Sequence, residues 1–279
     1  MTRGDGLKRV VAMGQYALLA VLCFVMLFPL LYAISGSLMT SREISTYPPA
    51  FLPHSPQLNN FSDVLRVLPI PRQYLNSIVV AVCVMIGQLA TSILSAYAFA
   101  FLRMPFRNLI FGIFLATLMV PWEAVVIPNY LTIADNHLIN SYPALILPFL
   151  AAGFGTFLLR QFFLGFPKDL YEAALVDGVG HLRFLWSILI PLSRPAIAAL
   201  AIWSFLQAWN QFLWPLLVIN KDTMQTLQIG ISRLQDAEAA TAPNFILAGT
   251  VLALIPTLLL IYFGQRHIVR GLTAGAVRG

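Results

Sequence analysis

The clearest pattern along the chain is a series of long apolar runs separated by short polar segments. A membrane-spanning helix needs about 20 consecutive, mostly apolar residues. Six runs reach or approach this length, at about residues 10–38, 72–103, 109–121, 142–159, 195–219 and 244–264. The first is too long for the apolar part of a signal peptide and has no clear cleavage site, so we expect it to be retained. The pattern predicts an all-α polytopic membrane protein with six transmembrane helices.

Composition supports this prediction. Of the 279 residues, 59% are hydrophobic and 10% are charged, whereas a typical soluble domain is about 25% charged. Cys23 and Cys83 lie inside apolar runs, form no Cys-x-x-Cys pair and have no metal-ligand spacing, so we expect no metal site. The net charge of +6 is better explained by membrane topology than by binding to nucleic acid.

The distribution of Lys and Arg predicts the orientation. If the N-terminus is cytoplasmic, twelve of these residues lie on the cytoplasmic side and five on the other side. Because positive charges concentrate in cytoplasmic loops, we expect both termini in the cytoplasm. The segment between the fourth and fifth runs is then cytoplasmic as well, and the loops at about 39–72 and 220–243 face outward, where a binding protein would dock.

A charged stretch from Pro167 to Pro195, here called the coupling segment, interrupts the apolar pattern. It contains six of the 28 residues that are Asp, Glu, Lys or Arg. It begins as a short predicted helix with Asp169 as a possible N-cap and an apolar side formed by Leu170, Ala173, Ala174 and Leu175.

The pair Gly178 and Gly180 then interrupts this helix. A second amphipathic segment follows, and Pro191 ends or kinks it; its recurring apolar residues are Leu182, Leu185, Trp186 and Leu189. Two short helices joined at a glycine and held at a membrane surface are suited to docking into another protein. The alternative is an ordinary cytoplasmic loop.

The residues Glu172-Ala173-Ala174, Asp177-Gly178 and Ile190-Pro191-Leu192 resemble the EAA loop of ABC importer permeases. This resemblance implies a type I (MetI-like) importer transmembrane domain. It also implies coupling to an ATPase subunit through Glu172, Ala173, Ala174, Asp177, Gly178 and Pro191. Val179 departs from the pattern, since sugar permeases usually have alanine there.

Further stretches are similar to the carbohydrate-uptake branch, which includes maltose and glycerol-3-phosphate importer permeases. They are Met119-Val120-Pro121, Asn140 with Ala144 to Pro148, Phe157 to Phe163, Trp209 to Leu216, and Gln265 to Gly279. The resemblance covers about residues 76–279. It divides the chain into an N-terminal part (1–70), a transmembrane core (71–265) and a cytoplasmic tail (266–279).

The C-terminal tail is basic and rich in glycine. The resemblance implies that it lies between two ATPase subunits, with contacts from Arg270, Gly271, Thr273 and Gly275. Alternatively, it is a frayed basic end near anionic lipid.

Polar residues inside two apolar runs are candidates for the translocation path. Gln88, Thr91 and Ser95 share one helical face, and the fifth run carries Gln207, Asn210 and Gln211. Polar side chains at membrane depth usually face protein or a water-filled path. Hydrogen bonding between helices is the alternative.

The sequence also argues against catalysis by this chain. None of Lys8, Lys168 and Lys221 follows a glycine, so no P-loop is present. A membrane-embedded transferase should show a catalytic group of residues, and none is evident. An ion-coupled secondary transporter usually has ionisable residues inside its spans, and five of the six predicted spans have none.

The resemblance implies a bacterial or archaeal cytoplasmic membrane protein that works by alternating access. Its expected partners are a second homologous permease, two ATP-binding-cassette ATPases that hold ATP and Mg, an extracytoplasmic substrate-binding protein and membrane lipid. The expected cargo is a sugar, glycerol-3-phosphate or a glycerophosphodiester.

Overall fold

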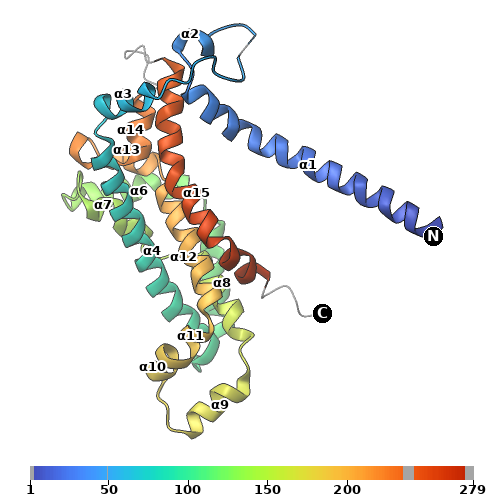
Figure 1. The fold of residues 1–279 in the computed structure, drawn as a ribbon. Helices are drawn as coiled ribbons and strands as arrows, with labels where there is room; N and C mark the ends of the chain where they lie inside the picture. Colours follow the sequence, from blue (N-terminus) through green and yellow to red (C-terminus); the bar gives the residue numbers. More distant parts are fainter. Residues whose placement is uncertain (1–2, 49, 235–241, 274–279) are drawn as a thin grey trace. The chain divides into compact units, whose positions relative to one another are not determined.

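The computed structural model describes residues 3–48, 50–234 and 242–273, and these residues form helices and loops without strands (Figure 1). They fall into two compact units. The first unit comprises residues up to Pro69 together with Ile231–Leu254. Its elements are α1 (Arg3–Ser37), α2 (Ser41–Ile44), α3 (Asn59–Val67) and the first part of α15 (Pro243–Thr273).

The second unit comprises Ile70–Gly230 and the residues from Ile255 onward. Its longest helices are α4 (Ile70–Phe101), α8 (Gly153–Leu164), α12 (Arg194–Trp209) and the second part of α15. Shorter elements connect them: α5 (Arg107–Ala116), η1 (Thr117–Met119), α6 (Trp122–Asp135), α7 (Tyr142–Ile146), η2 (Leu147–Phe149), α9 (Lys168–Val176), α10 (His181–Phe184), the π-helical turn η3 (Leu185–Leu189), α11 (Ile190–Leu192), α13 (Leu213–Val218), η4 (Asp222–Met224) and α14 (Leu227–Arg233).

Three helical stretches are long and apolar enough to cross a membrane without a break, at Val11–Ser37, Ile70–Phe101 and Pro243–Gln265. Three bent pairs also qualify: Arg107–Met119 with Trp122–Asp135 at 92°, Tyr142–Phe149 with Gly153–Leu164 at 43°, and His181–Leu192 with Arg194–Trp209 at 82°. Counting each bent pair as one span gives six in the described residues, the number that the sequence pattern predicts. The bounds differ, since the last bent pair begins at His181 inside the coupling segment and ends at Trp209, whereas the predicted fifth run is 195–219.

Proline lies at or beside each bend. Pro121 follows η1 and forces Val120 into an extended conformation (φ −76°, ψ 116°), since the residue before a proline avoids the helical region. Pro148 lies in η2, and Pro195 opens α12. A sharp turn at Ser193 therefore separates the second predicted helix of the coupling segment from α12, which begins the fifth span.

In the first unit, the end of α1 packs on the first part of α15. A side chain at Gly36 would lie 2.5 Å from the end of the Leu247 side chain, so glycine lets the two helices approach without displacing that leucine. The Asn60 amide donates to the carbonyls of Ser37 (2.8 Å) and Met39 (2.9 Å), which fixes α3 beside the end of α1. The rest of α1 leads away from α2 and α3 (Figure 1), and its apolar side chains are exposed along the span.

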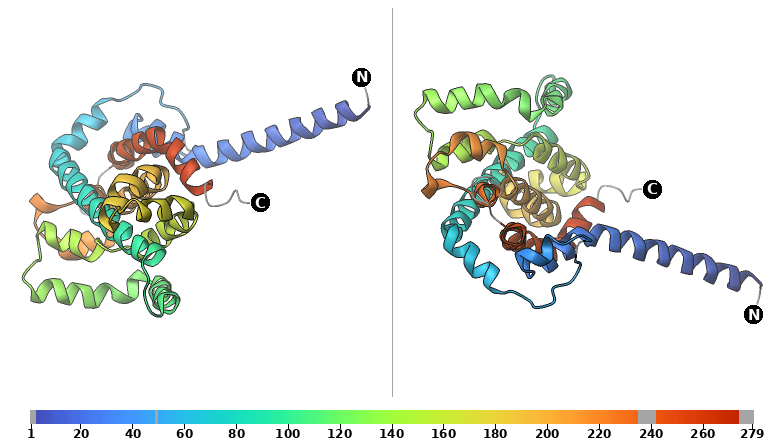
Figure 2. Two further views of the ribbon diagram at one scale, coloured as in Figure 1. Left: turned by 90° about the horizontal axis from the view of Figure 1, so that it is seen from below. Right: turned by 90° about the horizontal axis from the view of Figure 1, so that it is seen from above.

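In the second unit, α4, α8 and α12 pack side by side, as the views along the helices show (Figure 2). Gly155 of α8 allows the closest approach, because a side chain there would lie 2.3 Å from the Ser92 hydroxyl and 3.1 Å from Leu200. The buried core of this unit continues to the end that carries α9 and α10. This end positions the coupling segment.

Candidate functional site

Helix α9 of the coupling segment ends in a Schellman motif at Gly178. The Val179 amide donates to the Ala174 carbonyl (2.9 Å) and the Gly178 amide donates to the Leu175 carbonyl (3.1 Å), which is the bonding pattern of this helix end. Gly178 has φ +72°, a conformation that glycine adopts without strain. The structure thus places the expected interruption at Gly178, whereas Gly180 has an ordinary φ of −68° and begins α10.

The start of α9 differs from the sequence-based expectation. The helix begins at Lys168, and the N-cap position is Pro167, which provides no side-chain hydrogen bond. Asp169 therefore lies inside the first turn and is not the N-cap. At this position the positive end of the helix dipole stabilises the negative charge of its carboxylate, although the carboxylate is not a capping group.

A cluster of aromatic side chains fastens α9 and α10 to the end of α4. Tyr171 lies 4.9 Å from Phe101 of α4 and 5.0 Å from Phe184 of α10, measured between ring centroids. Phe184 also contacts Phe166, with 6.0 Å between ring centroids. Such ring pairs stabilise packing by about 0.5–1.5 kcal/mol each beyond their buried area. The coupling segment is thus a packed extension of the second unit.

Within the EAA motif, only Ala174 is buried. It packs in the core cluster of the second unit that includes Tyr97 of α4 and Phe184. Leu170, Ala173 and Leu175 are exposed, so the core of this chain covers only one of the four residues of the predicted apolar side. The helix uses Tyr171 and Ala174 as its buried face because the aromatic cluster lies on that side.

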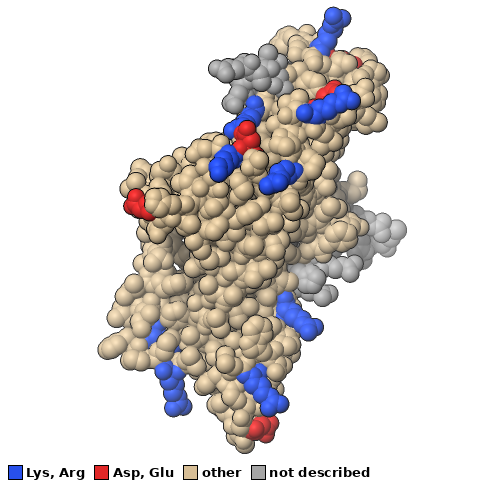
Figure 3. Space-filling model, turned by 90° about the vertical axis from the view of Figure 1, so that its left-hand side faces the viewer, with Lys and Arg blue, Asp and Glu red and all other residues tan. Residues whose placement is uncertain are grey.

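The opposite face of α9 is open. Glu172, Ala173 and Asp177 are exposed, and Val176 is 88% exposed. This face combines two carboxylates with uncovered apolar surface at the end of the unit. On the face drawn in Figure 3, several Lys and Arg side chains and an acidic side chain lie at the lower end, where Figure 1 places α9, and other Lys and Arg side chains lie higher up. A mixed charged and apolar surface of this kind is suited to docking with another protein.

The second half of the coupling segment is wound unevenly. Residues Leu185–Leu189 form a π-helical turn, and Pro191 lies in the short helix α11 that follows it. Because proline has no amide hydrogen, the helix cannot continue its regular bonding there. Ser193 then marks the 82° bend into α12. Pro191 therefore occurs within the kinked region, as the sequence predicts.

His181 connects the start of α10 to α4. Its Nδ1 atom lies 2.8 Å from the hydroxyl of Tyr97, and the side chain is otherwise exposed. This hydrogen bond joins the coupling segment directly to a membrane-spanning helix. No pattern in the sequence indicates this partner, because Tyr97 and His181 are 84 residues apart.

The residues proposed for tail contacts are only partly described. Arg270, Gly271 and Thr273 lie in the last turns of α15, whereas Gly275 lies outside the described residues.

The polar residues of α4 bond to the break between η2 and α8. Gln88 is buried and donates to the Phe149 carbonyl (2.9 Å). Thr91 donates to the Leu150 carbonyl (2.8 Å) as well as to its own helix. Ser95 is half-buried on the same helix. Gln88 and Thr91 satisfy carbonyls that the helix break leaves without partners.

The polar residues of the fifth span are placed differently. Gln207 and Asn210 are exposed at the end of α12. Gln211 is half-buried, and its buried Oε1 atom has no hydrogen-bond partner among the described residues. Among the described residues, no hydrogen bond joins the α4 set to the α12 set, although α4 and α12 pack against each other.

Sequence reasoning missed a hydrogen-bonded cluster near the start of α4. The Asn76 amide donates to the carbonyls of Thr223 (3.0 Å) and Gln225 (2.8 Å), and its oxygen accepts from the Tyr142 hydroxyl (2.8 Å). The Asn140 oxygen accepts from the amides of Asn220 and Lys221. These bonds shape the loop that contains η4. The only sequence signal for it is an asparagine beside each predicted loop; in the structure Asn76 is buried and Asn140 is half-buried.

Among the described residues, no group of three or more His, Cys, Asp and Glu side chains is arranged to hold a metal ion.

Comparisons with known proteins agree with the geometry of this site. Residues 88–274 match the family described as "Binding-protein-dependent transport system inner membrane component". A protein of Agrobacterium fabrum named "sn-glycerol-3-phosphate transport system permease protein UgpE" is 39% identical, with 98% of each chain covered. A Brucella abortus protein of the same name is 40% identical over 88% of this chain and 90% of its own length.

The fold is also similar to a solved structure. The TM-score is 0.83 against a bacterial ABC transporter involved in the import of the acidic polysaccharide alginate, at 23% identity, with 95% of this chain and 98% of that chain covered. That likeness confirms the type I importer fold. Together with the family match over the coupling segment, these relationships show that the chain belongs to the binding-protein-dependent transport system inner membrane components, the permeases of ABC importers.

Proposed function

We propose that this permease carries sn-glycerol-3-phosphate, or a closely related phosphorylated polyol, across the cytoplasmic membrane. The relatives that match nearly the whole chain are named for sn-glycerol-3-phosphate transport. The transporter similar in fold is involved in alginate import, but at 23% identity it supports the fold and not the cargo.

The proposal includes the partners of a complete importer. A second permease forms the other half of the path, two ATPases bind ATP and Mg, and a substrate-binding protein delivers the cargo from outside. The observation that supports coupling to an ATPase is the construction of α9: Ala174 and Tyr171 anchor it, while Glu172 and Val176 remain exposed. Force on the exposed face would pass through the aromatic cluster to α4.

Transport in reconstituted vesicles tests the cargo. The chain is purified with its partner subunits and placed in proteoliposomes that contain ATP. We expect uptake of labelled sn-glycerol-3-phosphate that requires ATP and the binding protein, and much weaker uptake of maltose. Uptake of maltose but not of sn-glycerol-3-phosphate would contradict the assignment of cargo while leaving the importer assignment intact.

The variant Glu172→Lys tests the coupling site. Reversing an exposed charge should leave folding unchanged, because surface substitutions usually alter stability by no more than about 0.5 kcal/mol. We expect normal membrane insertion and loss of ATPase stimulation by the loaded binding protein. Arg183→Gln, in α10 of the same segment, serves as a control for a change of charge at this end. Wild-type stimulation in Glu172→Lys would rule out Glu172 as a contact.

A further inference from the structure

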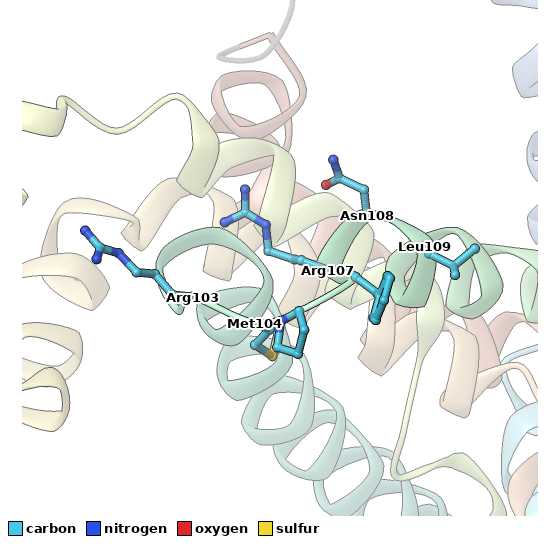
Figure 4. A pocket seen from close by; sticks show the side chains of 7 residues that line it. Arg103, Met104, Arg107, Asn108 and Leu109 are labelled. Carbon is cyan, nitrogen blue, oxygen red and sulfur yellow. The ribbon is translucent and has the colours of Figure 1, made fainter.

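The connection between α4 and α5 forms an open pocket that the transport mechanism does not use. Residues 103–109 line a cavity of about 730 Å³ (Figure 4). In this view Arg107 and Asn108 point upward at the start of α5, Arg103 extends away to the left from the end of α4, and Leu109 extends along α5. The pocket follows the end of a membrane-spanning helix, so it lies at the boundary between hydrocarbon and water.

The positive charge around this pocket is not neutralised by the chain. Among the described residues, no carboxylate lies within ion-pair distance of Arg103 or Arg107. Within the described part of the chain, Arg107 donates one hydrogen bond, to the Ala100 carbonyl at 3.4 Å. Arg103 has no protein acceptor in this part of the chain. Two guanidinium groups at one turn therefore keep most of their donors available for an anion.

A third arginine increases the positive field. Arg160 of α8 is about nine-tenths buried, and its guanidinium carbon lies 3.9 Å from the centre of the Phe111 ring of α5. Its Nε atom has no hydrogen-bond partner within the described residues. Arg107 is close enough to Arg160 for their charges to repel each other. Arg160 does not line the pocket and lies on the Phe111 side of α5, so its charge adds to the positive field at this end of the helix without contacting the ligand.

The backbone of α5 favours the same kind of ligand. The helix begins after Phe106, which has φ +54° and provides no side-chain cap. Its first amide groups have no acceptor within the helix, and the helix dipole favours negative charge there. A phosphate group fits both the free amides and the arginine side chains.

An apolar strip runs from the pocket along α5. Phe106, Leu109 and Ile113 recur at intervals of three and four and are 77%, 62% and 62% exposed. Phe111, on the opposite side, packs against Phe99 with 5.2 Å between ring centroids. The Phe111 face thus holds α5 against α4. The opposite, apolar face is exposed next to the cationic pocket and can contact hydrocarbon chains.

We propose that this pocket binds the phosphate of an anionic phospholipid such as phosphatidylglycerol. Arg103, Arg107 and the first amides of α5 hold the phosphate, Arg160 supplies additional positive charge, and the acyl chains lie along Phe106, Leu109 and Ile113. Soluble phosphate has the same charged group, but only a lipid also uses the adjoining apolar strip. The site anchors the α4–α5 connection at the membrane surface and is independent of the transported cargo.

Native mass spectrometry of the complex that the full-length chain forms in detergent tests this proposal. Titration with dioleoyl phosphatidylglycerol is compared with titration with the zwitterionic lipid dioleoyl phosphatidylcholine. Each arginine near an anionic headgroup contributes about 1 kcal/mol, which is about fivefold in affinity. We therefore expect Arg103→Gln with Arg107→Gln to weaken phosphatidylglycerol binding about 25-fold.

The matched control is Arg42→Gln with Arg66→Gln, which removes the same charge from helices α2 and α3 of the first unit. We expect this control to retain wild-type lipid affinity. Arg103→Lys with Arg107→Lys keeps the charge and should retain most binding, which separates loss of the site from misfolding. Equal affinity for both lipids, or equal losses in the two Gln pairs, would overturn the proposal. Displacement of phosphatidylglycerol by an equal concentration of inorganic phosphate would also overturn it, by assigning the site to a soluble anion.

Discussion

Gly178 shows how one residue sets the shape of the coupling segment. Its φ of +72° is required by the hydrogen bonds that end α9. No atom lies within 4 Å of the place where a side chain would begin. The requirement for glycine therefore comes from the backbone conformation and not from crowding.

We predict that Gly178→Ala and Gly178→Pro differ in severity. Alanine can adopt a positive φ at a cost of roughly 1–2 kcal/mol, so ATPase stimulation by the loaded binding protein should fall only partly. Proline cannot adopt φ +72° and removes the amide that bonds to Leu175, so stimulation should be lost. Gly180→Ala is the control, because Gly180 has an ordinary φ and open space around it. Equal effects at the two glycines would refute this account.

Glu43 shows a second effect at the scale of one residue. The amide of Thr40 (2.7 Å), its hydroxyl (2.9 Å) and the amide of His54 (3.0 Å) all donate to the carboxylate. These bonds, chiefly that from the Thr40 amide, lower the pKa of Glu43 below its ordinary value of 4.5. The ionised side chain thereby stabilises the start of α2.

This pKa shift predicts a dependence on pH. Because the folded-state pKa is lowered, the stabilisation is present above pH 4.5 and is lost as pH falls through the lower, folded value. Hydrogen exchange at residues 40–46, corrected for intrinsic rates, should therefore show protection that declines on acidification. Glu43→Gln should show weak protection and no such decline. A decline that persists in Glu43→Gln would assign the titration to another group.

At the scale of elements, α4 organises the second unit. It packs against α8 and α12, holds the break before α8 through Gln88 and Thr91, and contacts the coupling segment through Tyr97 and Phe101. Motion of α9 would therefore reach the middle of the membrane through one helix. Gln88 and Thr91 hold helices together, whereas Gln207 and Asn210 are exposed at the end of α12.

We predict that thiol reagents distinguish these two sets. In a background with Cys23→Ser and Cys83→Ser, Asn210→Cys should react readily with a water-borne reagent, and its rate should change when ATP is trapped. Gln88→Cys should react much more slowly, because position 88 is buried against Phe149. Gln88→Ala should reduce the free energy of unfolding by about 1 kcal/mol through the lost hydrogen bond. Fast labelling at position 88 would place it on the translocation path.

At the scale of the whole molecule, each of the two units combines two stretches that are separated in the sequence. The first joins the N-terminal elements to the first part of α15, through contacts such as Gly36 with Leu247 and Asn60 with Asn244. The second contains the coupling segment and the helices that anchor it. The two parts of α15 therefore belong to different units, although the helix is continuous.

Removal of residues 271–279 tests the role of the C-terminus in the assembled importer. The segment follows the last span and has few large apolar residues, so membrane insertion should be unchanged. We expect altered ATPase activity in the assembled complex, because this tail is proposed to contact the ATPases. A full-length chain with Arg270→Gln separates loss of charge from loss of length. Failure of the truncated chain to insert would show that the tail is structural.

The sequence by itself determined the membrane-spanning class, the family and the position of the coupling segment. Apolar runs must be buried in lipid whatever their tertiary packing, and the glycine at position 178 and the proline at position 191 restrict the backbone locally. These features depend on residues near one another in the chain, and the fold and family comparisons confirm the class and the family.

Only the tertiary structure decided which face of each helix is buried and which side chains become partners. Ala174 is buried and Leu175 exposed because the aromatic cluster of Phe101, Phe166 and Phe184 lies on one side of α9. Gln88 bonds to a carbonyl 61 residues away, and Arg160 stacks on Phe111 of another helix. Such partners are brought together by packing between helices, and local spacing carries no information about which helix will lie opposite.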